Sequence, residues 1–115
     1  MKIKTSELTG AALDWAVAKA MGEDDAPGSF LDGVVPHPDY LKFYPSTDWA
    51  QGGPIIESEK IAVVTSVDDA NEWVASIFEP NWNFNLTGPT PLIAAMRCYV
   101  ASKLGDEVEI PEGLQ

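Results

Sequence analysis

Cysteine and histidine are scarce in this chain of 115 residues, which contains one of each. A single cysteine, Cys98, excludes an internal disulfide and a zinc site built from several cysteines. Cys98 lies in the middle of a predicted helix, where a small buried role is expected, so a Cys–His catalytic pair is disfavoured. The lone histidine, His37, lies between two prolines and has no evident catalytic partner, which favours an exposed loop histidine.

Basic residues are also few. Seven Lys and Arg face eighteen Asp and Glu, which gives a formal net charge of −11. Because phosphate contacts need clustered Lys and Arg, nucleic acid and anionic membrane are both disfavoured as partners. The acids are scattered along the chain, which favours a role in solubility. An acidic face that binds a basic partner or imitates nucleic acid is the alternative.

Long apolar runs are absent. The longest covers residues 92–96, and Arg97 ends it, so no segment is long enough to cross a membrane. The start M-K-I-K-T-S-E lacks the apolar stretch of a signal peptide, and we therefore expect a soluble cytosolic protein. Apolar residues at 45% and charged residues at 22% are typical of a folded chain, and the length fits one domain over residues 1–115.

Two helices are predicted. Residues 8–21 follow Thr5-Ser6-Glu7, which is a helix-start signal, and Gly22 ends them. Residues 92–104 follow Thr90 as N-cap and Pro91 at the first helical position, and they end at Gly105. Both segments are apolar around most of their circumference, so both helices are expected to be largely buried.

Short alternating segments predict strands. Residues 60–66 and 72–78 are expected to form an antiparallel meander around a turn at 67–71, and residues 54–57 are expected to enter a strand. Residues 1–4 and 107–110 also alternate, and if they pair, their lysines would face Glu107 and Glu109. Loop chemistry is the other explanation for these acids. The predicted fold class is a single α+β domain, a small antiparallel sheet against two helices, with residues 23–43 docked as an irregular segment.

Two aromatic stretches have no clear helical or strand period. The first, residues 44–57, reads Y-P-S-T-D-W-A-Q-G-G-P-I-I-E, and we expect it to be an irregular central loop. The second, residues 79–87, has three asparagines around Trp82 and is also expected to be a loop. A loop that contains tryptophan either fills a core or presents a binding surface.

Arg97 suggests how these stretches would form a site. An arginine in an apolar helix must reach solvent, a carboxylate or an anion. One interpretation is a structural ion pair, with Asp14, Asp48 or Glu57 as partner. The other is a pocket in which an aromatic ring stacks on a flat ligand while Arg97 and the helix start hold a phosphate or carboxylate. The candidate ligand-binding residues are Tyr44, Thr47, Asp48, Trp49, Gln51, Gly52, Gly53, Trp82, Thr90 and Arg97.

Catalytic and metal-binding motifs are missing. The chain has no Walker loop, no G-x-G-x-x-G, no H-E-x-x-H and no G-x-S-x-G. We therefore predict no catalytic residues, no metal and no cofactor. An enzyme ranks third, behind a ligand-binding protein and an acidic interaction protein, and it would need a perturbed carboxylate such as Asp48 in a deep cleft.

Three blocks of the chain resemble the NinX-like phage family. They are K-I-K-T-S-E-L-T-G-A-A-L-D-W-A-V-A at residues 2–18, S-T-D-W-A-Q-G-G-P-I-I-E at 46–57 and G-P-T-P-L-I-A-A-M-R-C-Y-V-A-S-K-L-G-D-E-V at 88–108. The resemblance implies a phage-encoded accessory protein in the cytoplasm of an infected bacterium. The family has no established biochemical function and supplies no catalytic residues.

The leading hypothesis is a non-enzymatic protein that binds a small, nucleotide-like ligand or a host protein through residues 44–57. The alternative is an acidic interaction protein that blocks a host DNA-binding factor. The sequence leaves the oligomeric state open.

Overall fold

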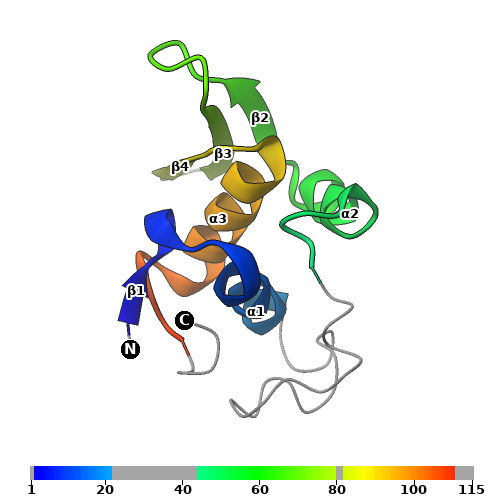
Figure 1. Cartoon of the computed structure of the whole chain (residues 1–115), viewed down its shortest axis with the longest axis vertical. Coiled ribbons are helices and arrows are strands. Elements are labelled where there is room, and N and C mark those ends of the chain that lie inside the picture. Colours follow the sequence, from blue (N-terminus) through cyan, green and yellow to red (C-terminus); the bar gives the residue numbers. More distant parts are fainter. Residues whose placement is uncertain (1, 22–43, 80–81, 111–115) are drawn as a thin grey trace.

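Helix α3 (Pro91–Leu104) lies at the centre of the computed structural model, which describes residues 2–21, 44–79 and 82–110 (Figure 1). It contacts the three-stranded sheet, both other α-helices and the short segments near the two ends of the described chain. Eight of its fourteen residues are buried. These neighbours explain why α3 has no distinct polar face: almost every direction around it meets another element.

The first predicted helix is confirmed as α1 (Gly10–Met21), and it packs against α3. It begins two residues later than expected because Thr5–Glu7 form a 3₁₀ turn, η1. Seven consecutive residues of α1, 12–18, are buried. Alanines among them permit the close approach of the two helices.

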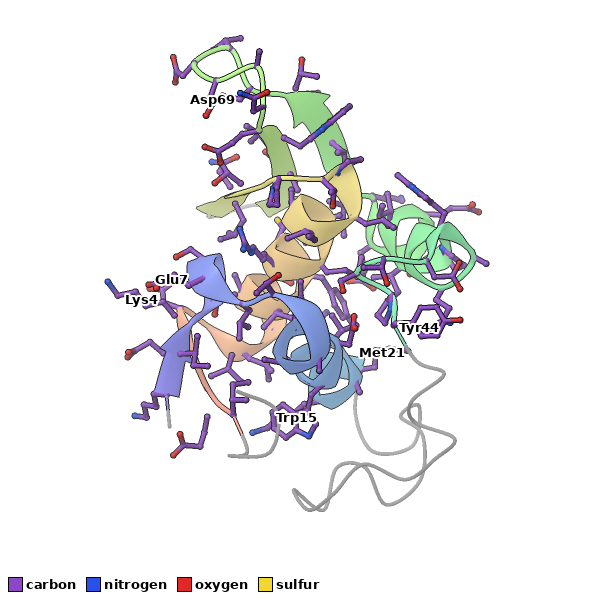
Figure 2. The ribbon with its side chains drawn as sticks, viewed as in Figure 1. Lys4, Glu7, Trp15, Met21, Tyr44 and Asp69 are labelled. Atoms are coloured by element: carbon purple, nitrogen blue, oxygen red, sulfur yellow. The ribbon has the colours of Figure 1, made fainter. Side chains whose placement is uncertain are left out.

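Three antiparallel strands form the main sheet, in the order β2 (Ala62–Thr65), β3 (Trp73–Glu79) and β4 (Trp82–Gly88). The buried residues Ala75 and Ile77 lie two positions apart on β3, and α3 packs against this strand and β4. The predicted meander and the α+β class are confirmed. The turn between β2 and β3, with Asp69 near its tip, lies at the far end of the molecule from α1 (Figure 2).

The expectation of a loop at residues 79–87 is wrong, since β4 occupies most of that range. Its pairing with β3 runs from Trp73 opposite Gly88 to Glu79 opposite Trp82. Aromatic and aliphatic residues do alternate with asparagines and threonine here, which is a strand period. The asparagines favoured a turn, but a full ladder with β3 outweighs that local preference because β propensity depends on tertiary context.

A second, two-stranded sheet joins β1 (Lys2–Lys4) to β5 (Glu107–Glu109). The register places Ile3 opposite Val108, and the two lysines opposite Glu109 and Glu107. The predicted pairing of the chain's two ends is therefore confirmed, together with its match of charges. Val108 is buried in the core, and Figure 1 places this ribbon beside the C-terminal end of α3, away from the main sheet.

The largest correction concerns residues 44–57, expected to be an irregular loop that leads into a strand. They contain a turn followed by helix α2 (Trp49–Glu59), which packs beside α3. Asp48 is the N-cap, and its Oδ1 accepts a hydrogen bond from the Ala50 N–H at 3.0 Å. Pro54 is exposed within the helix, so the carbonyl that loses its partner there can face water. The β-branched Ile55 and Ile56 indicated a strand, but capping and burial of Ile55 favour the helix.

Residues 23–43, predicted to dock as an irregular segment, and His37 within them lie outside the described residues. Within the described part of the chain, no helix is long and apolar enough to cross a membrane.

Candidate functional site

The turn that leads into α2 is held by its own polar side chains. The Gln51 Oε1 accepts a hydrogen bond from the Tyr44 N–H at 2.7 Å, and Gln51 Nε2 donates to Asp48 Oδ2 at 3.0 Å. The Asp48 N–H also donates a hydrogen bond to the Tyr44 carbonyl at 3.1 Å. Two residues predicted to contact a ligand are thus engaged in shaping the turn. The Asp-x-x-Gln spacing is a helix-start signal that the sequence analysis missed.

A buried carboxylate fastens this turn to α1. Asp14 Oδ1 accepts a hydrogen bond from the Ser46 N–H at 2.9 Å, and both residues are buried. Burial raises the pKa of the Asp14 carboxyl, while the nearby Ser46 hydroxyl and N–H oppose that rise. The Ser46 Oγ makes no hydrogen bond of standard geometry with any described residue. The Ser46 hydroxyl lies near enough to the Asp14 carboxylate to stabilise its charge, but it still has a donor and an acceptor to offer.

Gly52 brings α2 close to its neighbours. A Cβ atom at this position would overlap the Pro45 carbonyl oxygen and lie 2.6 Å from Leu92 Cδ2. Gly53, the next residue, has open space around the corresponding position. The first glycine of the Gly-Gly pair therefore permits contact between the turn, α2 and α3, whereas the second does not serve packing.

A hollow of about 220 Å³ lies between this turn and the start of α3. Trp49 forms part of its wall and is 57% exposed. None of the described residues in the lining carries a charge, and most of the lining is apolar. The lining residues are Ser46, Thr47, Trp49, Thr90, Pro91, Leu92 and Ile93.

The start of α3 offers this hollow little capacity to bind an anion. Thr90 is the N-cap as predicted: its Oγ1 accepts a hydrogen bond from the Ile93 N–H at 3.1 Å, and its carbonyl accepts one from the Ala94 N–H at 3.0 Å. Pro91 has no N–H. Within the first turn, the Leu92 N–H is the group left without a partner among the described residues, whereas anion sites at helix starts use several such groups.

Arg97 lies apart from the hollow and clamps two segments of main chain. Its Nε donates to the Leu8 carbonyl at 2.7 Å and its Nη1 to the Thr87 carbonyl at 2.8 Å. Burial lowers the pKa of the guanidinium, while the charges of Glu72 and Glu7 oppose that change. Neither expected role holds for these contacts. Its hydrogen bonds go to carbonyls rather than to a carboxylate, and the side chain does not line the hollow.

The predicted site residues therefore separate into groups. The structure brings together Thr47, Trp49 and Thr90. Tyr44 is exposed at the entry to α2 but is outside the lining (Figure 2). The side chain of Trp82 lies outside what the structure describes. Sequence reasoning omitted four lining residues, Ser46, Pro91, Leu92 and Ile93, although each is adjacent to or near a residue that was named.

Chemistry of other kinds finds little support in the described residues. They contain no group of three or more His, Cys, Asp or Glu placed to hold a metal ion. Cys98 is fully buried, and burial raises the pKa of its thiol to about 11. At neutral pH this thiol is protonated, so it is a weak nucleophile and a poor metal ligand.

The model of one protein family, described as Bacteriophage P22, NinX, matches residues 4–103. This chain belongs to the NinX family. No curated protein matches it. The matched span includes the α2 turn and the start of α3, so the whole hollow lies within the part that is shared with this phage family.

Proposed function

We propose that this phage protein binds a small, flat and largely uncharged ligand in the hollow beside Trp49, acting in the cytoplasm of the infected cell. The observation that carries the proposal is the 57% exposure of an indole on the wall of an apolar hollow. Tryptophan is highly buried on average, because its large apolar surface is costly to hydrate. A ring stacked on Trp49 would remove that surface from water.

The lining defines the ligand's chemistry. Trp49, Pro91 and Ile93 supply apolar area, while the exposed Thr47 hydroxyl can accept a hydrogen bond. Stacked aromatic pairs contribute about 0.5–1.5 kcal/mol beyond the area that they bury. The volume, about 220 Å³, lies below the range of drug-sized pockets and suits one or two fused rings.

The same lining argues against a phosphate. Arg97 is engaged elsewhere, none of the described residues that line the hollow is charged, and the first turn of α3 offers it the Leu92 N–H. Of the nucleotide-like ligand expected from the sequence, we therefore retain the ring system and exclude the phosphate. A nucleobase or nucleoside meets the chemistry better than a nucleotide, because a desolvated phosphate would have no cation to pair with.

The proposal is tested by native mass spectrometry of the protein purified from phage-infected cells, compared with its denatured mass. We expect a retained small mass that Trp49→Ala removes. Tyr44→Ala is the matched control, since Tyr44 is an exposed aromatic of the same segment that does not line the hollow. A small mass that survives Trp49→Ala would contradict the proposal, as would a host polypeptide that is lost with Trp49→Ala.

A titration of the isotope-labelled protein followed by NMR tests the ligand's charge. Adenosine is expected to shift the amide signals of Thr47, Trp49 and Leu92, and AMP to bind no more tightly. AMP binding at least about tenfold tighter, roughly 1.4 kcal/mol, would show that a phosphate is recognised and would overturn the uncharged class.

A further inference from the structure

Strand β4 is an edge of the main sheet, because the order β2-β3-β4 leaves its outer side without a paired strand among the described residues. An unpaired edge presents main-chain N–H and C=O groups that can accept an added strand. In each strand, alternate residues direct their N–H and C=O toward one neighbour or the other. Two hydrogen bonds show which residues of β4 direct these groups outward.

The first is the bond from the Ser66 N–H to the Glu72 carbonyl at 3.0 Å, at the end of the β2–β3 pair. In an antiparallel pair, bonded and non-bonded positions alternate. The register then directs the main chain of Val74 toward β2 and that of Ala75 toward β4, where Ala75 pairs with Leu86. Asn85, one position along, directs its N–H and C=O outward.

The second bond agrees with this assignment. Arg97 Nη1 reaches the Thr87 carbonyl, which is two residues from Asn85 and must also point away from β3. Arg97 thus occupies one outward carbonyl of β4. The Ser76 hydroxyl donates a hydrogen bond to Asn85 Oδ1 at 2.6 Å, so the side chain of Asn85 is engaged with β3. The main-chain N–H and C=O of Asn85 remain at the outer edge of β4.

A cleft of about 560 Å³ borders this edge. Leu86 and Ala101 contribute its apolar part, and the β1–η1 segment and the start of β5 form the opposite wall. That wall is firmly held, since the Thr5 N–H donates to the Asp106 carbonyl at 2.7 Å and Thr5 Oγ1 donates to the Gly105 carbonyl at 2.6 Å. The lining residues are Lys4, Thr5, Ser6, Asn85, Leu86, Ala101, Asp106 and Glu107.

Charge distinguishes among possible occupants of the cleft. Lys4 lies opposite Glu107 in the β1–β5 register, so Asp106 is the lining charge without a cross-strand lysine. Figure 2 shows Lys4 and Glu7 on this side of the molecule, away from α2. A second copy would bring another chain of net charge −11 to the same edge, which like-charge repulsion opposes. A basic segment would instead be attracted.

We propose that the outer edge of β4 binds an extended, basic segment of a partner protein as an added strand. Its main chain bonds the N–H and C=O of Asn85, and one side chain enters the cleft over Leu86. A Lys or Arg two positions along, on the same face of the added strand, reaches Asp106. This mode takes its affinity from main-chain hydrogen bonds and its selectivity from the side chains that alternate along the added strand. It is independent of the hollow beside Trp49, which lies at the start of α3.

The probe is the capped hexapeptide Val-Val-Lys-Lys-Val-Val, in which each face carries lysine two positions from valine, titrated into the full-length, isotope-labelled protein and followed by NMR. Two comparison peptides replace the lysines with glutamate or carry N-methyl groups along one edge. We expect the basic peptide to shift the amides of residues 4–6 and 85–87. The acidic and the N-methylated peptides are expected to bind at least about fivefold more weakly.

Asn85→Pro and Asn85→Ala form a matched pair. Both lose the contact with the Ser76 hydroxyl, but only proline removes the outward N–H, and an edge strand tolerates proline at such a position. We expect Asn85→Pro alone to weaken the basic peptide at least about fivefold. Equal binding by the two variants, equal binding of the N-methylated peptide, or shifts centred on α2 would each overturn the proposal. The N-methylated peptide tests it on the wild-type protein even if Asn85→Pro does not fold.

Discussion

Replacing Gly52 with alanine should undock α2, whereas the same change at Gly53 should stabilise the protein. Both glycines lie inside α2, and neither has a positive φ. In a helix interior, alanine is favoured over glycine by about 0.8–1.0 kcal/mol, so propensity alone predicts the same gain at both positions. The two differ in their surroundings. A Cβ at Gly53 meets nothing within 4 Å, while one at Gly52 overlaps the Pro45 carbonyl oxygen and comes within 2.6 Å of Leu92 Cδ2.

The structure provides little room to relieve this overlap. Pro45 and Leu92 are buried, and one of the two overlapping atoms belongs to the backbone. Overpacking of a well-packed site costs about 1–3 kcal/mol, which exceeds the gain in helix propensity at the upper end of that range. We expect Gly53→Ala to raise the free energy of unfolding by about 0.5–1 kcal/mol and Gly52→Ala to lower it by about 1–2 kcal/mol.

Thermal and urea unfolding followed by circular dichroism measures both variants. For a chain of this size, 1 kcal/mol corresponds to a shift in Tm of about 4–8 °C, so the two variants should differ by roughly 6 °C or more. Because Leu92 also lines the hollow, Gly52→Ala should further alter the amide signals of Thr47 and Thr90. If Gly52→Ala were as stable as Gly53→Ala, the close contact of α2 with the turn and α3 would be refuted.

Three further predictions concern polar groups that are buried or partly buried. Asp14→Asn retains an acceptor for the Ser46 N–H but loses a carboxyl whose pKa burial raises above 3.8. The charged form of Asp14 is disfavoured in the folded state, so the wild-type protein loses stability as pH rises from about 4 toward neutrality. The Asp14→Asn variant should therefore become more stable relative to wild type over this range in urea unfolding. A difference that stays constant with pH would contradict this. Arg97→Met should cost about 1–3 kcal/mol, chiefly by leaving the carbonyl of the buried Leu8 unpaired, because the exposed Thr87 carbonyl can bond water, and Arg97→Lys should cost less in the same assay; a loss well below 1 kcal/mol for Arg97→Met would refute this role. Cys98, with a thiol pKa of about 11, should react with a disulfide reagent at pH 8 only after unfolding; fast labelling of the folded protein would refute its burial.

Elements with strong local signals could be predicted from the sequence. Helix α3 has a threonine cap, a proline at its first position and a closing glycine, all within the helix or directly next to it. The β2–β3 meander alternates at period two, and the complementary charges of β1 and β5 indicated their register across the whole chain. In each case the information lies in the residues of the element or of its direct partner.

Segments in which local preferences conflict could not be predicted. Residues 44–57 combine glycines, proline and β-branched residues that disfavour a helix, and α2 forms because Asp48 caps it and its core side is buried. Likewise, the asparagines of β4 favour turns until β3 supplies a ladder. Tertiary contact outweighs propensities of a few tenths of a kcal/mol to about 1 kcal/mol per residue, and such contacts are not visible in a short stretch of sequence.

The candidate site shows the same division. The sequence by itself determined which residues are unusual: a tryptophan in a segment of broken pattern, a helix start at Thr90 and an arginine in an apolar helix. Only the tertiary structure decided that Trp49 and Thr90 share a hollow while Arg97 turns to the carbonyls of Leu8 and Thr87. The physical reason is that a guanidinium takes the nearest carbonyls that can satisfy it, and these come from segments 89 and 10 residues away along the chain.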